Sequence, residues 1–185
     1  PRYFRHAAHD LLQVFDAGRV HGDREFLVWQ SQRLTFNQFF DQVDRLAGQM
    51  VARFALQPGE RVAIAMRNQP AWLVAFAAIQ RCGAVCVPLN SWGLRDELQY
   101  ALQDSGSRLL LCDKARLDTL QEDLAREHRA TIVVGAQDES LSEYCLRFED
   151  LISAPAQPVL TLEIDPDAPA LILYTSGTTS RAKGA

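Results

Sequence analysis

Lysine is almost absent from this sequence, because Lys114 and Lys183 are its only two among 19 basic residues. The 23 acidic residues give a formal net charge of −4 at pH 7. A surface that binds nucleic acid normally carries a basic stripe, so this balance argues against a nucleic-acid partner. Long apolar runs are also missing: the longest covers residues 71–79, whereas a bilayer-spanning helix needs about 20 apolar residues. We therefore expect a cytoplasmic protein without a transmembrane segment.

Cysteine and clustered metal ligands are scarce as well. The chain has 4 cysteines: Cys82, Cys86, Cys112 and Cys145. They are unevenly spread, and no second pair completes a zinc-binding pattern. His6 and His9 have a spacing that suits a metal on a helix, but no further ligands cluster with them. We expect free, buried thiols that act as small hydrophobic side chains, and no metal site.

A repeating pattern of apolar runs predicts the fold class. Four such runs lie at residues 61–66, 84–89, 108–112 and 130–134, about 22 residues apart, the length of one strand, one helix and two loops. The segments between them resemble helices and cover residues 70–82, 94–104 and 114–128. Because the runs are continuously apolar, they predict a mostly parallel sheet of successive βα units with helices on both faces. At 185 residues, 48% of them hydrophobic, the chain can bury a core as one domain.

The first part of the chain carries signals of other elements. Residues 25–29 and 33–35 predict a small N-terminal hairpin. The capping-box pattern from Thr35 to Gln38 predicts the start of a helix. The apolar face of that helix consists of Phe36, Phe39, Phe40, Val43, Leu46, Ala47 and Met50. Residues 9–17 suggest an amphipathic helix with Leu11, Leu12 and Phe15 facing inward. The prolines of residues 153–169 indicate a loop that leads into the final strand.

The end of the chain has the composition of a phosphate-binding loop. Residues 170–174 are apolar and predict a buried strand, and a segment rich in Gly, Ser and Thr follows and closes on Lys183. Hydroxyls and free backbone N–H groups can donate to phosphate oxygens, glycine lets the backbone approach, and lysine neutralises charge. By itself, such a polar tract at a chain end would also fit a solvated tail. The apolar strand before it favours the phosphate loop.

Two familiar phosphate-binding patterns do not fit this loop. A Walker-type loop needs a second glycine five positions after Gly177, where Ala182 stands, and a hydroxyl residue after Lys183, where Gly184 stands. The dinucleotide fingerprint also fails, because Gly177 has no glycine at the required offsets.

The loop instead resembles the signature of adenylate-forming enzymes, which include acyl- and aryl-CoA synthetases, luciferases and the adenylation domains of peptide synthetases. That signature is an aromatic residue followed by Thr-Ser-Gly-Thr-Thr-Gly-x-Pro-Lys-Gly. The matching residues are Tyr174, Thr175, Ser176, Gly177, Thr178, Thr179, Lys183 and Gly184. Upstream stretches are similar to the family too: residues 34–39 with 45–47, 59–63 with 67–68, 83–90, 97–98, Tyr100 and 104–106. The sequence of residues 88–92 most resembles that of bacterial fatty-acyl-CoA synthetases.

The resemblance implies a two-step reaction. A carboxylate attacks the α-phosphorus of ATP with the help of Mg²⁺, which gives an acyl-adenylate and pyrophosphate, and the thiol of coenzyme A then displaces AMP. It assigns phosphate binding to Thr175, Ser176, Gly177, Thr178, Thr179, Lys183 and Gly184, with Lys183 on the β- and γ-phosphates. It also implies that residues 1–185 form one N-terminal subdomain that ends just after the phosphate loop. No catalytic set is complete within it, so we expect the fragment alone to be inactive and open to self-association.

Two departures from the signature bear on the loop. Ser180 stands at a glycine position, which costs roughly 1–2 kcal/mol if the backbone there needs a positive φ. Ala182 stands at a proline position, which leaves the loop less rigid before a ligand binds. We expect the residues after Gly177 to be poorly held without a neighbouring chain. Alternatives at this point are a nucleotide-binding or scaffolding module without turnover, an aryl- or amino-acid-activating ligase, and a flavodoxin-like domain.

Overall fold

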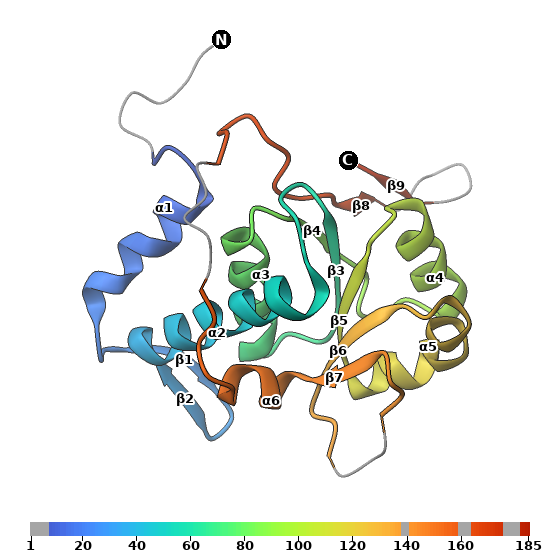
Figure 1. Cartoon of the computed structure of the whole chain (residues 1–185), viewed down its shortest axis with the longest axis horizontal. Helices are drawn as coiled ribbons and strands as arrows, with labels where there is room; N and C mark the ends of the chain where they lie inside the picture. Colours follow the sequence, from blue (N-terminus) through green and yellow to red (C-terminus); the bar gives the residue numbers. More distant parts are fainter. Residues whose placement is uncertain (1–7, 138–140, 159–163, 176–181) are drawn as a thin grey trace.

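A parallel sheet of five strands forms the centre of the structure (Figure 1). The computed structural model describes residues 8–137, 141–158, 164–175 and 182–185. The strands are β3 (Arg61–Ala65), β4 (Val85–Pro88), β5 (Leu109–Asp113), β6 (Ala130–Val134) and β7 (Cys145–Arg147), in the spatial order β4-β3-β5-β6-β7. Every neighbouring pair is parallel. The predicted α/β class and the four predicted central strands are confirmed.

Side chains alternate between the two faces of this sheet and fill two separate cores. On β3, Val62 and Ile64 join the core beneath α2 (Phe36–Phe54), α3 (Pro70–Arg81) and α6 (Phe148–Ser153). Ala63 and Ala65 point to the other face, into the core beneath α4 (Arg95–Asp104) and α5 (Lys114–Glu127). Figure 1 shows the two helix groups on opposite sides of the sheet, as the continuously apolar strands predicted.

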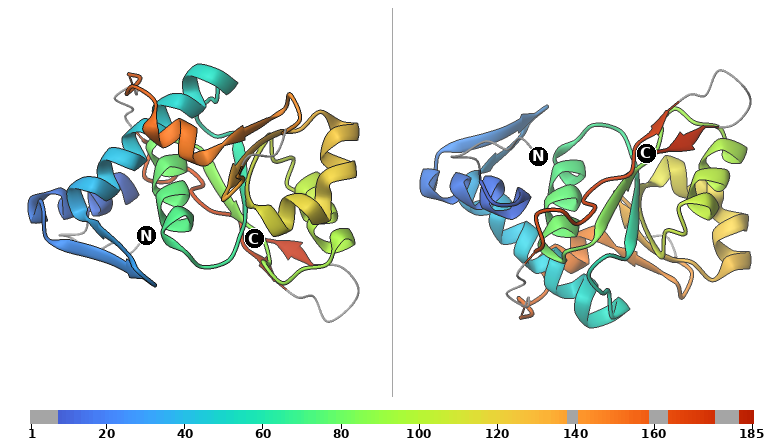
Figure 2. Two further views of the ribbon diagram at one scale, coloured as in Figure 1. Left: turned by 90° about the horizontal axis from the view of Figure 1, so that it is seen from below. Right: turned by 90° about the horizontal axis from the view of Figure 1, so that it is seen from above.

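The predicted N-terminal elements are present, with one difference. Strands β1 (Glu25–Trp29) and β2 (Gln32–Thr35) form an antiparallel hairpin at the end of the molecule away from α4 and α5 (Figure 2). Both hydrogen bonds of the predicted capping box open α2. Helix α1 (Leu11–Asp16) has only six residues, and 3-10 helix η1 (Ala17–His21) follows it. The prediction that Leu11 faces inward is wrong, because only one side of this short helix rests on α3 and Leu11 is 39% exposed.

Strand β7 and helix α6 were not predicted. Strand β7 has three residues, too few to show a period, and it extends the sheet beyond β6. Phe148 and Leu151 of α6 are buried and join the core beneath α2. No helix among the described residues is long and apolar enough to cross a membrane.

The segment after α6 crosses α2 at very close range. A Cβ atom on Gly48 would lie 2.6 Å from the backbone oxygen of Gln157. On either side of that crossing, Arg45 Nη1 donates to the carbonyl of Ala154 at 2.8 Å and Gln49 Nε2 donates to that of Pro155 at 3.1 Å. The predicted 153–169 loop starts one residue too early, because Ser153 is the last residue of α6; its described part from Ala154 on contains no helix or strand and leads back across the molecule toward β4.

Candidate functional site

Residues 170–172 lie along the outer edge of β4. The amide of Cys86 donates to the carbonyl of Ala170 at 3.0 Å, and the amide of Ile172 donates to the carbonyl of Cys86 at 2.9 Å. A third hydrogen bond comes from α3, where Gln80, which is 5% exposed, donates its Nε2 to the Ala170 carbonyl at 3.0 Å. These bonds fix the point from which the predicted phosphate loop starts.

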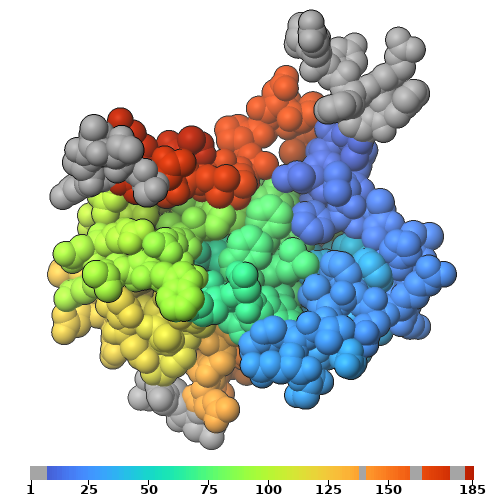
Figure 3. Space-filling view, turned by 180° about the vertical axis from the view of Figure 1, so that it is seen from behind, coloured from blue at the N-terminus to red at the C-terminus, as the bar shows by residue number. Residues whose placement is uncertain are grey.

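The prediction of a buried strand over residues 170–174 is only partly right. The segment forms one parallel bridge, between Leu171 and Cys86. Leu171 and Ile172 are half-buried, and Leu173 is 51% exposed. The physical reason is position: the segment lies outside the edge strand, so one side faces the domain and the other faces solvent. Figure 3 shows this C-terminal segment on the surface of the molecule.

The chain then enters a two-stranded hairpin that the sequence did not predict. Strand β8 (Tyr174–Thr175) pairs antiparallel with β9 (Lys183–Gly184), with Tyr174 opposite Gly184 and Thr175 opposite Lys183. Leu173 and Ala185 extend the ladder, because each amide donates to the other's carbonyl, at 2.8 and 2.9 Å. Both ends of the predicted phosphate loop are thus held side by side.

Part of the predicted site lies outside the described residues. This applies to Ser176, Gly177, Thr178 and Thr179, and the departure at Ser180 and most of the stretch expected to be poorly held lie there too. The structure places the three remaining site residues, Thr175, Lys183 and Gly184, together at the mouth of the loop.

Gly184 has a packing role in the hairpin. A Cβ atom there would lie 2.9 Å from Cγ2 of Ile172 and 3.3 Å from Cζ of Tyr174. Both distances are shorter than comfortable carbon contacts, so a side chain at this position would push β9 away from β8. The glycine of the signature therefore lets the two strands close at the base of the loop.

Lys183 presents a cation at the mouth of the loop. Its side chain is exposed, and among the described residues no carboxylate lies within ion-pair distance of its ammonium group. Lys114, the other lysine, is paired with Asp118 at 2.6 Å on α5. The charge of Lys183 is therefore available to an anion, and the hydroxyl-bearing Thr175 lies opposite it.

Tyr174 ties the hairpin to α4. Its hydroxyl donates to Oδ2 of Asp104, the last residue of that helix, at 2.7 Å. The Tyr100 hydroxyl donates to the other oxygen of the same carboxylate at 3.3 Å. Burial and the neighbouring Asp104 carboxylate raise the pKa of Tyr174, so the phenol keeps its proton and remains a donor. The sequence showed Asp104 only as part of a stretch similar to the family and Tyr174 only as the aromatic residue of the signature, and nothing in it predicted their contact.

A cavity of about 240 Å³ opens between the hairpin and the carboxyl end of β4. It is lined by Leu89, Asn90, Glu97, Leu98, Ala101, Tyr174 and Ala182. The Asn90 side chain donates to Glu97 at 2.9 Å, which fixes the polar wall. Parallel α/β sheets bind ligands beyond the carboxyl ends of their strands, and this cavity has that location.

Trp92 follows β4 at the same edge and is 78% exposed, with the guanidinium of Arg67 over its ring. Trp72 stacks on Phe76 with ring centroids 5.6 Å apart and packs against the core.

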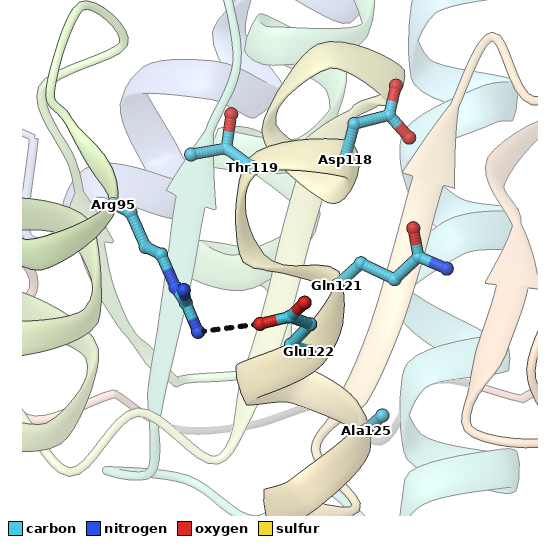
Figure 4. A pocket seen from close by; sticks show the side chains of 6 residues that line it. All are labelled: Arg95, Asp118, Thr119, Gln121, Glu122 and Ala125. Carbon is cyan, nitrogen blue, oxygen red and sulfur yellow. Dashed lines mark ion pairs between the residues drawn. The ribbon is translucent and has the colours of Figure 1, made fainter.

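A larger hollow of about 520 Å³ lies between α4 and α5, away from the hairpin (Figure 4). Its charged groups already have partners, because Arg95 contacts Glu122 at 3.2 Å and the buried Asp123 at 2.6 Å, and Asp118 pairs with Lys114 at 2.6 Å. None of the predicted site residues lines it. We therefore place the candidate site at the hairpin.

The cysteines are structural, as predicted. All four are free and buried, and burial raises the pKa of Cys82 and of Cys86 to about 12. Thiols with such a pKa are poor nucleophiles at neutral pH, so they contribute no chemistry to the site.

Comparison with known proteins gives one family. The model of the AMP-binding enzyme family matches residues 14–185. The oxalate–CoA ligase of Arabidopsis thaliana is 33% identical over 151 residues, which are 82% of this chain and 29% of that protein. A crotonobetaine/carnitine–CoA ligase of Citrobacter koseri is 28% identical over 186 residues, with 95% of this chain and 35% of that protein covered. The chain thus spans about a third of the length of these relatives.

The fold is also that of a solved structure in this group. The crystal structure of the anthranilate CoA ligase AuaEII, in complex with anthranoyl-AMP, superimposes with a TM-score of 0.82 at 22% identity. The match covers all of this chain and 34% of that one. At this identity the comparison supports the architecture described above.

Proposed function

This chain belongs to the AMP-binding enzyme family, and from that premise we propose that it is the N-terminal part of an acid–thiol ligase. The whole enzyme would join a carboxylic acid to ATP, release pyrophosphate, and transfer the acyl group from AMP to the thiol of coenzyme A. Residues 1–185 would supply the phosphate-binding loop of that enzyme and would not complete either step alone.

The pairing of Thr175 with Lys183 carries this proposal. It sets a hydroxyl-bearing residue and a lysine opposite each other at the mouth of the loop, beyond the edge of a parallel sheet, and the Thr175 hydroxyl donates to the Lys183 carbonyl at 3.5 Å. An ammonium without a carboxylate partner among the described residues suits a polyanion, because a bound phosphate would be its counter-ion. The phosphate-binding roles of Ser176, Gly177, Thr178 and Thr179 remain part of the proposal on the strength of the signature.

The contribution of these residues is positioning and charge neutralisation. Lys183 would hold the β- and γ-phosphates and stabilise the negative charge that develops on the leaving pyrophosphate. Thr175 would donate its hydroxyl to a phosphate oxygen and orient the α-phosphorus toward the carboxylate. Among the described residues no group of three or more His, Cys, Asp or Glu side chains could hold a metal ion.

The acid substrate is proposed only by class. The resemblance of residues 88–92 to bacterial fatty-acyl-CoA synthetases favours a fatty acid. The relatives, however, are named for oxalate and for crotonobetaine or carnitine, and the similar crystal structure is that of an anthranilate ligase. We therefore propose a carboxylic acid, with fatty and aryl acids as the two candidates. Self-association and a cytoplasmic setting stay predictions.

Calorimetric titration of the chain with Mg-ATP tests the proposal. We expect saturable binding that Lys183→Ala weakens by roughly 10- to 150-fold, since one charge-assisted contact contributes about 1.5–3 kcal/mol. Lys114→Ala is the matched control, because it removes the other lysine, which is ion-paired on α5, and should leave the affinity unchanged. No heat at millimolar ATP would contradict the loop assignment.

A hydroxamate assay tests the second part. The chain with ATP, Mg²⁺, hydroxylamine and either a fatty or an aryl acid should form no acyl-hydroxamate. Product formation by the chain alone would overturn its proposed dependence on further residues. Saturable ATP binding by a parent protein that makes no product with any acid would favour the binding-module alternative.

A further inference from the structure

The carboxylate of Asp104 joins two tyrosines from distant parts of the chain. Tyr174 lies 70 positions away in sequence and donates at 2.7 Å, while Tyr100 lies one helical turn away and donates at 3.3 Å. The shorter bond reaches β8, the first strand of the hairpin at the base of the predicted phosphate loop. One carboxylate therefore connects the helix to that hairpin.

Helix stability does not explain a carboxylate at this position. Asp104 is the last residue of α4, where the helix dipole disfavours negative charge. Two backbone carbonyls at the end of the helix already have hydrogen-bond donors. The Ser105 amide donates to the Ala101 carbonyl, and the Gly106 amide donates to the Gln103 carbonyl. A neutral residue at position 104 would suit the helix better, so the reason for the charge lies in what it binds.

The hydrogen bonds to β4 and α3 hold the chain only as far as Ile172, and the contact between Tyr174 and Asp104 holds it beyond that point. Gln80 and Cys86 hold the chain at Ala170 and Ile172. From Leu173 onward the backbone leaves β4 and pairs only with β9 among the described residues. The Tyr174 hydroxyl is the point at which a side chain of this hairpin reaches α4, and the ring above it also packs against Gly184 of the returning strand.

We propose that Asp104 is a positioning residue for the phosphate loop, holding the Tyr174 hydroxyl and thereby the direction in which the β8–β9 hairpin leaves the sheet edge. With this bond in place, Thr175 and Lys183 stay at the carboxyl end of β4 before a ligand arrives, which lowers the cost of ordering them on binding. The proposal rests on the proposed function for its ligand, Mg-ATP, and on the geometry alone for the tether.

Hydrogen exchange of the 185-residue chain tests the tether. In Tyr174→Phe and Asp104→Ala, the amides of Leu173 and Ala185 should exchange about tenfold faster, because a hydrogen bond to a charged group contributes on that scale. The amides of β3 and β5 should be unchanged. Asp104→Asn keeps an acceptor oxygen for the tyrosine without the charge and should restore most of the protection. Tyr100→Phe removes the longer bond to Asp104 and leaves the Tyr174 bond in place, so it serves as the matched control.

Two further readouts separate positioning from a merely structural role. The midpoint of urea unfolding should not fall in Asp104→Asn, since the helix end loses an unfavourable charge. The Kd for Mg-ATP should rise about tenfold in Tyr174→Phe and Asp104→Ala and less in Asp104→Asn.

Each contrary outcome is specific. Unchanged exchange at Leu173 and Ala185 in both Tyr174→Phe and Asp104→Ala would overturn the tether, as would an equal increase across β3 and β5. Faster exchange with an unchanged Kd would overturn the positioning role. If the wild-type chain does not bind Mg-ATP, the proposed function fails, and the exchange experiment still decides whether Asp104 holds the hairpin.

Discussion

Thr175 and Lys183 are eight positions apart in sequence and lie directly opposite each other in the β8–β9 pair. This register sets a hydroxyl and an ammonium group at the two ends of one loop. The signature by itself gives the order of these residues along the chain, whereas the hairpin shows that Thr175 and Lys183 lie opposite each other at the base of the loop. The following predictions address the contacts that maintain this arrangement and the domain that supports it.

Gly184→Ala should open the base of the loop. The new methyl group would meet Ile172 Cγ2 and the Tyr174 ring at less than normal contact distance, and relief of such overpacking typically costs about 1–3 kcal/mol. Because the strain is confined to the hairpin, we expect faster amide exchange at Leu173 and Ala185 with the urea midpoint unchanged. Ala185→Ser, an exposed change in the same ladder, is the control. Unaltered exchange in Gly184→Ala would show that β9 does not close on β8 as described.

Gly48→Ala should destabilise the whole domain. In the middle of an exposed helix this change would stabilise by about 1 kcal/mol, because alanine has the higher helix propensity. At Gly48 the added methyl would collide with the backbone of Gln157, so we expect a net loss of about 1–2 kcal/mol in the free energy of urea unfolding. Gly18→Ala is the comparison, because its methyl would meet only phenylalanine ring atoms at 3.4 Å. A more stable Gly48→Ala protein would mean that residues 154–157 do not rest on α2.

Stability should fall in acid partly because of Asp123. The hydrogen bond from Arg95 lowers the pKa of this carboxyl, burial opposes that shift, and a second hydrogen bond from Arg126 reinforces it. The stabilisation is complete above the unfolded pKa of about 3.9 and is lost as the pH falls through the lower folded value, since the unfolded chain then takes up the proton first.

Urea titrations between pH 6 and pH 3 test this dependence. Asp123→Asn should flatten the fall in the unfolding midpoint below about pH 4. Asp118→Asn on the same helix changes a carboxylate that is 52% exposed and should alter the slope less. An equal acid slope in wild type and Asp123→Asn would contradict the assignment.

The thiols should resist alkylation in the folded chain. Burial raises the pKa of Cys82 and Cys86 to about 12, and it also raises that of Cys112. At pH 8 the thiolate fraction is then about one in ten thousand, and access is blocked as well. Mass spectrometry after iodoacetamide should detect no adduct at these three cysteines until urea unfolds the protein. Rapid labelling of Cys86 in the native chain would show that residues 170–172 leave the edge of β4.

The sequence predicted those parts of the structure that repeat or are decided locally. Regular spacing of apolar runs predicted β3 to β6 and the helices between them, and Thr35 with Gln38 predicted the start of α2 within one residue. Such features depend on side chains only a few positions apart. Strand β7 lacks a period because it has three residues, and it forms because β6 offers it an edge.

The candidate site was predicted in composition but not in geometry. Residues 170–174 have the apolar content of a buried strand, yet their place outside β4 leaves Leu173 exposed, which only the strand order decides. The β8–β9 pair has two residues in each strand and includes a lysine and a glycine, so no local propensity indicates it. The contact of Tyr174 with Asp104 spans 70 positions, and no pattern in a single sequence connects the two residues.

The route of the chain after α6 determines when the loop can form. Strand β7 lies at one edge of the sheet, whereas residues 170–172 return across α2 to β4 at the other edge. Among the described residues, the hairpin and the segment before it are anchored by Gln80, Cys86 and Asp104. Each of these lies 70 or more positions earlier in the sequence than the residue that it holds. Closing loops of that length costs conformational entropy. The anchoring contacts can offset this cost only when the sheet and α4 are already in place. We therefore expect the β8–β9 hairpin to be among the last of the described parts of this chain to form during folding.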